Sequence, residues 1–244
     1  MTEPYIAEHR GRLFNLLLPI ARYVFTNLTV TLLGIPLLFL LNRTTIIGRS
    51  KVPHRRNTLL LCNHQSMIDS FLVGVCAYWP RSFLKPFLIP WNPAAQENFY
   101  HPWWLGLLSD LWKCIPVRPG RRDPKALYRM MRALESGTMT LFPEGTRTRD
   151  GSIGPGRPGA GLLILGNRPT VVPVTIDGMD RVLPIRSRFP RLFRRIYVYY
   201  GEPLDYSDFL ERPRSKETAQ QLVDRAMETL RKQQALIQEL KNRP

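Results

Sequence analysis

The feature that most limits the fold of this chain is a run of 20 uncharged residues between Arg22 and Arg43. It reads YVFTNLTVTLLGIPLLFLLN and follows a second apolar stretch, LFNLLLPI (13–20). As a helix rising about 1.5 Å per residue, the longer run would extend about 30 Å, the thickness of the hydrocarbon core of a bilayer. Its Thr and Asn side chains weaken it as a span, and Pro19 and Pro36 favour breaks in the helix.

We therefore expect the segment 1–43 to be helical and membrane-associated, either crossing the bilayer or lying in its interface as a pair of helices. Arg22, between the two apolar stretches, suits both arrangements, whereas the length of the uncharged run disfavours a pair of buried core helices. No small-residue cleavage site follows, so a removed signal peptide is not expected. If the segment crosses, the larger number of Lys and Arg after it places the rest of the chain on the cytoplasmic face.

From residue 44 to 244 the pattern is that of one globular domain in which short apolar runs alternate with helical periodicity. This alternation predicts an α/β fold with a mixed, largely parallel central sheet flanked by helices. The expected strands are 44–48, 58–62, 82–88, 114–118, 138–143, 171–176 and 195–200. The expected helices are 66–78, 102–112, 123–135, 159–165 and 215–241.

Composition limits the partners of this domain. The chain has 35 Lys and Arg against 19 Asp and Glu, a net charge of +16, which favours nucleic acid, acidic lipids or phosphorylated substrates. Its three cysteines are widely spaced within apolar sequence, as buried thiols of a reducing compartment are, and its four histidines lack metal-ligand spacing.

The stretch LCNHQSMIDSFL (61–72) places His64 and Asp69 with four residues between them at a predicted strand-to-helix turn. One reading is a capping box, in which Ser66 and Asp69 satisfy free amides of the first helical turn. The other is a dyad, in which the carboxylate of Asp69 fixes the tautomer of His64 and leaves the second ring nitrogen to take a proton. The two readings are compatible.

A second stretch, TLFPEGTRTRDG (140–151), leaves a predicted strand through proline and glycine. Taken alone it is equally a turn or a site, because it carries a carboxylate (Glu144), a hydroxyl (Thr146) and two guanidiniums (Arg147 and Arg149). Ligands of open α/β sheets bind at the carboxyl ends of the strands. A guanidinium at this edge can hold a phosphate with two parallel hydrogen bonds.

Together these stretches resemble the glycerophospholipid acyltransferases, most closely the 1-acyl-glycerol-3-phosphate acyltransferases, over roughly residues 45–205. NHQS with Asp69, CIPVRPG (114–120), FPEGTR (142–147) and VVPVTIDG (171–178) resemble the four family motifs in order. The second motif departs from the usual spacing, since Val117 directly precedes Arg118, and Arg121 and Arg122 are alternatives for its arginine. Lys85, in FLKPFLIP, resembles a lysine often found between the first two motifs.

The resemblance implies that 44–244 is an acyltransferase catalytic domain that converts 1-acyl-glycerol-3-phosphate (lysophosphatidate) to phosphatidic acid. His64 would be the general base and Asp69 its orienting partner, while Arg118 and Arg147 bind the acceptor's phosphate. Glu144 with Gly145 would position its glycerol end, and Thr146 and Lys85 would also bind substrate. The donor would be acyl-CoA or acyl carrier protein, without metal or redox cofactor. Glycerol-3-phosphate or another lysophospholipid is an alternative acceptor.

Two further segments carry alternative interpretations. HPWWLGLLSDLW (101–112) is expected in the core, with an acyl-chain tunnel as the second reading. The segment 181–201 has six arginines before Ile196 and is read as a surface for anionic lipids or as a solvated loop. A nucleic-acid-binding module would explain the charge but not the apolar N-terminal run, and a phosphate-ester hydrolase would need metal ligands that the spacing does not offer.

Overall fold

In the computed structural model, which describes residues 11–100, 103–118 and 123–242, the chain forms a five-stranded sheet in the order β1-β7-β6-β2-β5. The expected mixed, largely parallel sheet is confirmed, since only β6 and β7 run antiparallel. Its strands are β1 (Arg43–Ile47), β2 (Thr58–Cys62), β5 (Thr138–Leu141), β6 (Thr170–Asp177) and β7 (Arg195–Tyr200).

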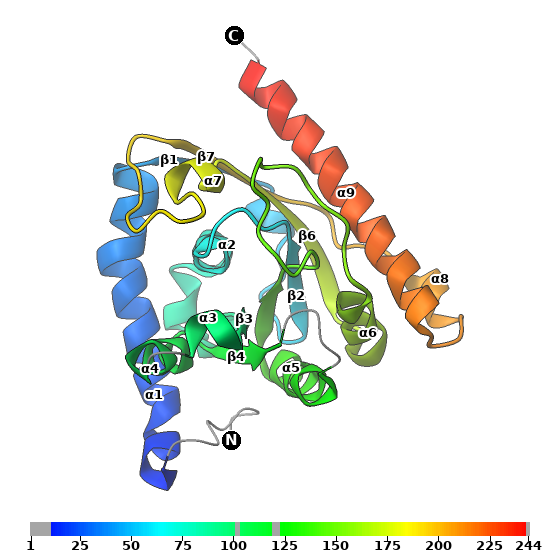
Figure 1. Ribbon diagram of the computed structural model, residues 1–244, viewed down its shortest axis with the longest axis horizontal. Helices are drawn as coiled ribbons and strands as arrows, with labels where there is room; N and C mark the ends of the chain where they lie inside the picture. Colours follow the sequence, from blue (N-terminus) through cyan, green and yellow to red (C-terminus); the bar gives the residue numbers. More distant parts are fainter. Residues whose placement is uncertain (1–10, 101–102, 119–122, 243–244) are drawn as a thin grey trace.

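A second sheet of two parallel strands, β3 (Asn92–Ala95) and β4 (Cys114–Val117), continues the first at its β5 edge. Trp91 makes the connection, because its N–H donates to Thr138 O and its carbonyl accepts from Thr140 N, both at 2.9 Å. The bridge from Trp91 to Met139 is parallel. The carboxyl ends of β2, β4, β5 and β6 therefore lie at one edge of the combined sheet (Figure 1).

Side chains alternate between the two faces of this sheet, as the pleat requires. Leu59 and Leu61 of β2 pack with the core of α5 (Pro124–Ser136), α6 (Pro158–Asn167) and α9 (Lys216–Asn242). Leu60 and Cys62 pack on the other face with α2 (Asp69–Tyr78) and part of the N-terminal segment. Because helices cover both faces, β2 is buried throughout and apolar from residue 59 to 62.

The predicted helices and strands are present with one exception. The predicted strand 82–88 is wrong, since the chain there makes two 3-10 turns, η4 (Arg81–Phe83) and η5 (Pro86–Leu88), among prolines that cannot donate to a ladder. The sequence NPAA of β3 gave no strand signal because it has no β-branched or aromatic residue. The remaining short elements are η3 (Arg49–Lys51), α3 (Gln96–Phe99), α4 (Trp103–Leu111), α7 (Met179–Val182) and α8 (Ser207–Leu210).

The N-terminal segment is one continuous helix rather than two. α1 (Arg12–Thr29) contains Pro19 and passes into two π-helical turns, η1 (Val30–Gly34) and η2 (Pro36–Leu40). Ile35 N donates to Val30 O and Leu41 N to Pro36 O at 2.8 Å, each a π-type bond, so the helix widens on both sides of Pro36 instead of breaking. Within the described residues, Arg12–Leu40 is the helix long and apolar enough to cross a membrane, by length and composition alone.

This helix has its polar side turned inward. Arg22 Nε donates to Asp110 O at 2.7 Å, Thr26 Oγ1 to Leu111 O at 3.3 Å, and Asn27 Oδ1 accepts from Ser82 Oγ at 3.1 Å. The outward side is aliphatic and more than half exposed at Leu13, Leu16, Leu17, Ile20, Val24, Leu28, Leu32, Leu33 and Leu40. A helix on a water-soluble domain has the opposite arrangement.

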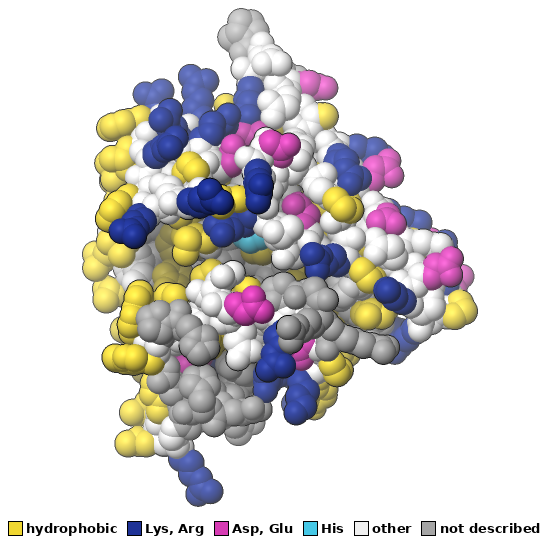
Figure 2. Space-filling model, in the orientation of Figure 1, with side chains coloured by type: hydrophobic (Ala, Val, Ile, Leu, Met, Phe, Trp, Pro, Cys, Tyr) yellow, Lys and Arg dark blue, Asp and Glu magenta, His cyan; other side chains and the backbone are white. Residues whose placement is uncertain are grey.

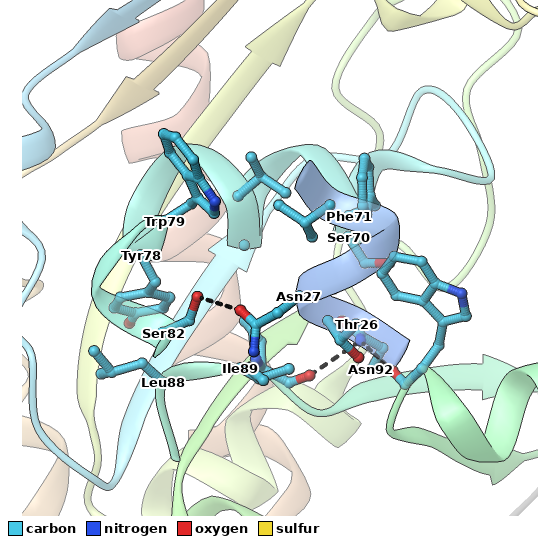
Figure 3. A pocket seen from close by; sticks show the side chains of 15 residues that line it. Thr26, Asn27, Ser70, Phe71, Tyr78, Trp79, Ser82, Leu88, Ile89 and Asn92 are labelled. Atoms are coloured by element: carbon cyan, nitrogen blue, oxygen red, sulfur yellow. Dashed lines mark hydrogen bonds between the residues drawn. The ribbon is translucent and has the colours of Figure 1, made fainter. Parts of the chain in front are cut away.

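A cavity of about 40 Å³ lies between this helix, α2 and the segment 88–92 (Figure 3). Thr26 and Asn27 line it from α1, and Phe71 lines it from α2. Trp79 Nε1 and Asn92 Oδ1, on two further lining residues, have no hydrogen-bond partner within the described part of the chain. Space and chemistry suit a few ordered waters, and the volume is too small for an acyl chain.

Candidate active site

The turn after β2 is held by its own side chains. Asn63, fully buried, donates from Nδ2 to Ile176 O at 3.0 Å and accepts from Ile176 N at 2.8 Å, which continues the β2–β6 pairing past the end of the strand. Gln65 Oε1 accepts from Met179 N at 3.1 Å, and Ser66 Oγ donates to Leu183 O at 3.2 Å. His64 therefore projects from a turn fixed on both sides.

His64 and Asp69 are in contact, with Nδ1 2.9 Å from Asp69 Oδ2. The same oxygen accepts the N–H groups of Gln65 at 2.6 Å and Ser66 at 2.7 Å. Asp69 is fully buried, and burial raises the pKa of its carboxyl against the opposing effect of these donors. In the part of the chain that the structure describes, His64 Nε2 makes no hydrogen bond and one side of the ring reaches solvent.

The capping box is half formed. Asp69 is the first residue of α2 and its carboxylate accepts the Ser66 N–H, but the Ser66 hydroxyl bonds to Leu183 instead of returning a bond to the Asp69 amide. The helix accordingly begins three residues after the predicted position. One carboxylate oxygen of Asp69 thus serves the turn and contacts the imidazole at once.

The loop after β5 closes over His64. The Phe142 ring stacks on the imidazole, with centroids 4.1 Å apart and planes 15° from parallel. Thr148 N donates to His64 O at 2.8 Å. The first and third motif-like stretches therefore form a single unit at the carboxyl edge of the sheet.

Glu144 lies beneath this unit and is only 5% exposed. The backbone amides of His64 and Gly154 lower the pKa of its carboxyl, and Oε1 has no hydrogen-bond partner among the described residues. Burial raises the pKa of Glu144 to about 7, and the nearby charge of Asp69 acts in the same direction. An unpaired buried carboxyl oxygen next to a histidine can accept a hydrogen bond from a substrate hydroxyl.

Gly145 turns the chain between Glu144 and the basic residues that follow. Its φ is +68°, and a Cβ there would lie 3.3 Å from Cδ and Nε of Arg157, which sits at the start of α6. Thr146 is exposed and Arg147 is half-buried. Three cationic or hydroxyl side chains therefore border this corner of the site.

The other predicted residues lie farther away. Arg118 follows β4 at the same sheet edge, where its Nε is 3.4 Å from Gln96 Oε1. It is three strand positions from β2, or about 14 Å. Lys85 is not brought to this edge, because α2 leads the chain back across the sheet and Lys85 lies near His54, before β2. Arg121 and Arg122 fall outside the described residues.

Figure 2 shows a histidine at the floor of a hollow whose rim carries several Lys and Arg side chains. A polar pocket of about 300 Å³ also adjoins Gln65, but it contains three carboxylates (Asp150, Asp177 and Asp180) against Arg181 and Lys241, and so does not suit a phosphate. Among the described residues, no group of three or more His, Cys, Asp and Glu could hold a metal ion.

Sequence reasoning missed three residues of the site. Phe142 and Arg157 could not be assigned to the site from the sequence, because the stack on His64 and the approach to Gly145 depend on the folded chain. The available signal for Arg157 was its position as a basic residue just before a helix. Arg231 comes from α9, where its Nη2 lies 3.3 Å from Gly154 O and its charge opposes the raised pKa of Glu144. Nothing in the periodicity of α9 distinguishes Arg231 from a solvated residue.

The stretch 101–112 meets the expectation of a core position only in part, since Gly106, Ser109 and Asp110 are buried. Its described part forms α4, whose Trp103 and Trp104 are 72% and 50% exposed, so they lie neither in the core nor in a tunnel. Trp112 packs edge-on against Phe25 and Phe71 and lines the small cavity beside α1. His101 and Pro102 lie outside the described residues.

Residues 43–177, more than half of the chain, match the model of the family described as Acyltransferase. The chain is 27% identical over 153 residues to 1-acyl-sn-glycerol-3-phosphate acyltransferase BAT2, chloroplastic, of Brassica napus, covering 59% of this chain and 40% of that protein. It is 25% identical over 182 residues to the 1-acyl-sn-glycerol-3-phosphate acyltransferase of Limnanthes douglasii, covering 72% and 54%. The matched region is thus less than two thirds of either relative.

The crystal structure of the 1-acyl-sn-glycerophosphate (LPA) acyltransferase PlsC from Thermotoga maritima has a similar fold. The TM-score is 0.57 at 22% identity, covering 96% of this chain and 98% of that chain.

Proposed function

Since the chain belongs to the acyltransferase family, we propose that it transfers a fatty acyl group from acyl-CoA or acyl carrier protein to the free hydroxyl of 1-acyl-glycerol-3-phosphate, giving phosphatidic acid. The observation that carries this proposal is the 2.9 Å contact of His64 with Asp69 at the sheet edge that also bears Glu144 and Arg147. Relatives from Brassica napus and Limnanthes douglasii that are named for this activity support the choice of acceptor.

In the proposed reaction His64 Nε2 takes the proton of the acceptor hydroxyl while the oxygen attacks the thioester carbonyl. The tetrahedral intermediate collapses, the carbon–sulfur bond breaks, and the thiol leaves with the proton that His64 returns. Asp69 holds Nδ1 protonated and its charge stabilises the imidazolium that forms between the two steps. Phe142, stacked on the ring, restricts its rotation.

The acceptor is held by charge at one end and hydrogen bonds at the other. Arg147, with Arg118 across the sheet edge, would bind the phosphate, and Arg157 adds a guanidinium beside Gly145. Glu144 Oε1 would accept from the glycerol, with Gly145 and Thr146 shaping its position. Holding the hydroxyl beside His64 supplies much of the acceleration through effective molarity.

We propose that the segment 1–43 attaches the catalytic domain 44–244 to a membrane without crossing it. Residues 22–41 are docked along the domain by Arg22, Thr26 and Asn27, so a crossing helix would draw α4, α2 and β1 into hydrocarbon. Lying in the interface, the helix instead places its aliphatic side in lipid. Three buried free cysteines suit a cytoplasmic face, and the net charge of +16 suits anionic lipids.

The test is transfer by the purified full chain in vesicles, from labelled acyl-CoA and labelled acyl carrier protein, to a panel of acceptors. We expect phosphatidic acid from 1-acyl-glycerol-3-phosphate, at a kcat/KM at least ten times that with glycerol-3-phosphate or lysophosphatidylcholine. Preference for either of these would assign the chain to the alternative acceptor. No transfer to any hydroxyl acceptor from either donor would overturn the proposal.

A further inference from the structure

The loop 184–194, between α7 and β7, exposes aromatic rings that folding does not explain. Phe189 and Phe193 are 80% and 82% exposed, and Leu192 lies beside them with 39% of its surface exposed. The loop also carries four exposed arginines and no acidic residue: Arg186, Arg188, Arg191 and Arg194. Within the described residues none of these four forms an ion pair.

The loop is held in a fixed shape. Phe193 N donates to Leu41 O at 2.7 Å, Arg194 N to Asn42 Oδ1 at 2.8 Å, and Arg191 N to Val182 O at 2.7 Å. Arg186 and Phe193 have φ angles of +74° and +59°. Left-handed backbone is unfavourable for a bulky residue. Neither the backbone conformation of Phe193 nor the exposure of its ring therefore stabilises the folded chain in water.

The loop continues the aliphatic surface of the N-terminal helix. It is tied to Leu41 and Asn42, directly after η2, where Leu40 is 76% exposed. Figure 1 has the loop beside the upper end of this helix. Figure 2 shows hydrophobic side chains along the same edge of the molecule, with Lys and Arg gathered at its upper end.

From these observations we propose that loop 184–194 is a second membrane contact, which inserts Phe189 and Phe193 among the acyl chains of an anionic bilayer while its arginines bind lipid phosphates. Apolar rings between basic side chains match the boundary between hydrocarbon and headgroups. An α1 helix lying alone in the interface could roll about its axis, whereas two contacts fix which side of the domain faces the lipid.

The proposed membrane contact is also connected to the candidate active site. The inference about substrate access drawn from this connection rests on the proposed function. The Ser66 hydroxyl bonds to Leu183, at the start of the loop, and Met179 of α7 bonds to Gln65. The residues that follow His64 are therefore joined through two hydrogen bonds to the segment 179–183, which leads directly into the loop. A lysophospholipid beside the loop would reach the site without leaving the interface.

Labelling tests the insertion without any catalytic readout. Cys62, Cys76 and Cys114 are buried, so a thiol-reactive fluorophore should react selectively with a Phe193→Cys protein. A Tyr128→Cys protein is the control, because Tyr128 is 65% exposed on α5, away from this surface. Each full-length protein is reconstituted in vesicles of phosphatidylcholine with and without phosphatidylglycerol, which contain lipids with a quencher on the acyl chain.

We expect the label at 193 to be quenched by the lipid quencher and shielded from aqueous iodide at least five-fold better than the label at 128, most strongly with phosphatidylglycerol. Equal iodide access at both positions would overturn the proposal. So would shielding at 193 that appears in detergent and grows with protein concentration, because a second copy of the chain would then cover the loop.

A double substitution, Phe189→Ser with Phe193→Ser, tests the extension to the site. It should lower transfer to a long-chain acceptor in anionic vesicles about ten-fold or more, from the lost burial of two rings, and leave transfer to a soluble short-chain acceptor unchanged. An equal loss with both acceptors would contradict membrane delivery. Because insertion at 193 is measured without turnover, an inactive protein would refute the proposed function and leave the membrane contact standing.

Discussion

Replacing Asp69 by Asn separates the two roles that one carboxylate oxygen has in this structure. Oδ2 accepts from Gln65 N, Ser66 N and His64 Nδ1 at 2.6, 2.7 and 2.9 Å. The Asn oxygen can keep the two backbone bonds. Its amide nitrogen then takes the position of Oδ1, which is buried and has no partner among the described residues. Asp69→Asn therefore retains the turn while removing the negative charge next to His64.

The expected effects differ in size. A buried NH₂ without an acceptor costs about 1–3 kcal/mol, offset in part because burial already disfavours the charged carboxyl, whose pKa it raises. We expect a net loss of stability of at most about 2 kcal/mol, or about 4–8 °C in Tm. Activity should fall about 10²- to 10⁴-fold, equivalent to about 2.7–5.4 kcal/mol in the barrier.

The assay measures kcat and Tm on the same preparations of the wild type, Asp69→Asn and a control, Asp123→Asn. Asp123 caps α5 by accepting Ala126 N at 3.0 Å, so its substitution tests an Asp that only caps a helix. The control should keep its activity. If Asp69→Asn lost more than about 8 °C in Tm and kept its kcat, Asp69 would be a helix cap alone and the dyad would be refuted.

Three further predictions concern the acceptor end of the site. Arg147→Ala and Arg118→Ala should each raise the acceptor KM ten-fold or more, from the loss of about 1.5–3 kcal/mol of charged hydrogen bonding, with partial rescue by Lys; a change in the donor KM alone would reverse the assignment of substrates. Glu144 has a pKa of about 7 in the folded state against an ordinary 4.5, so the folded state binds the proton more tightly than the unfolded state. The protonated carboxyl therefore stabilises the fold fully below pH 4.5, and this contribution is lost as the pH rises through 7. The free energy of unfolding of the wild type, relative to that of Glu144→Gln, should therefore fall by up to about 3 kcal/mol between pH 4.5 and 8. A free-energy difference that does not change with pH would contradict the raised pKa. Gly145→Ala should destabilise by about 1–3 kcal/mol through its φ of +68° and raise the acceptor KM, whereas Gly159→Ala, where a Cβ meets open space, should do neither.

Much of the fold could be predicted because its signals are local. The apolar run of β2 and the helical spacing after Asp69 are decided by neighbouring residues, so the strand 58–62 has its predicted bounds. The strand of Asn92–Ala95 could not be predicted, since its place depends on Trp91 pairing with β5, some 45 residues on. The segment 82–88 is apolar enough for a strand, but Pro86 within it cannot donate to a ladder, and the chain forms 3-10 turns instead.

The N-terminal helix shows where pattern reasoning stops. Length and composition predicted an apolar segment, but which side faces the domain depends on Arg22 meeting Asp110, 88 residues away. Pro36 predicted a break, whereas π-helical turns on both sides of it continue the helix. Both outcomes depend on packing that a linear sequence does not display.

The site was predictable to the extent that its residues follow strand ends. His64 and Glu144 come from neighbouring parallel strands, so their shared edge follows from topology. Arg157 and Arg231 reach the same place from two helices, through contacts with Gly145 and Gly154 that only the fold creates. Lys85 is the opposite case. It lies close to the first motif in sequence, but α2 leads the chain away from the carboxyl edge of the sheet, so Lys85 lies near His54 instead.

The account depends most directly on His64 as the group that removes the hydroxyl proton. The decisive measurement is the rate of phosphatidic acid formation from labelled acyl-CoA and 1-acyl-glycerol-3-phosphate, in vesicles, by the wild type and by His64→Ala of matched Tm. We predict product from the wild type and a rate about 10²- to 10⁴-fold lower, or undetectable, from the folded variant. A folded His64→Ala protein that kept more than a tenth of the wild-type rate would contradict the mechanism.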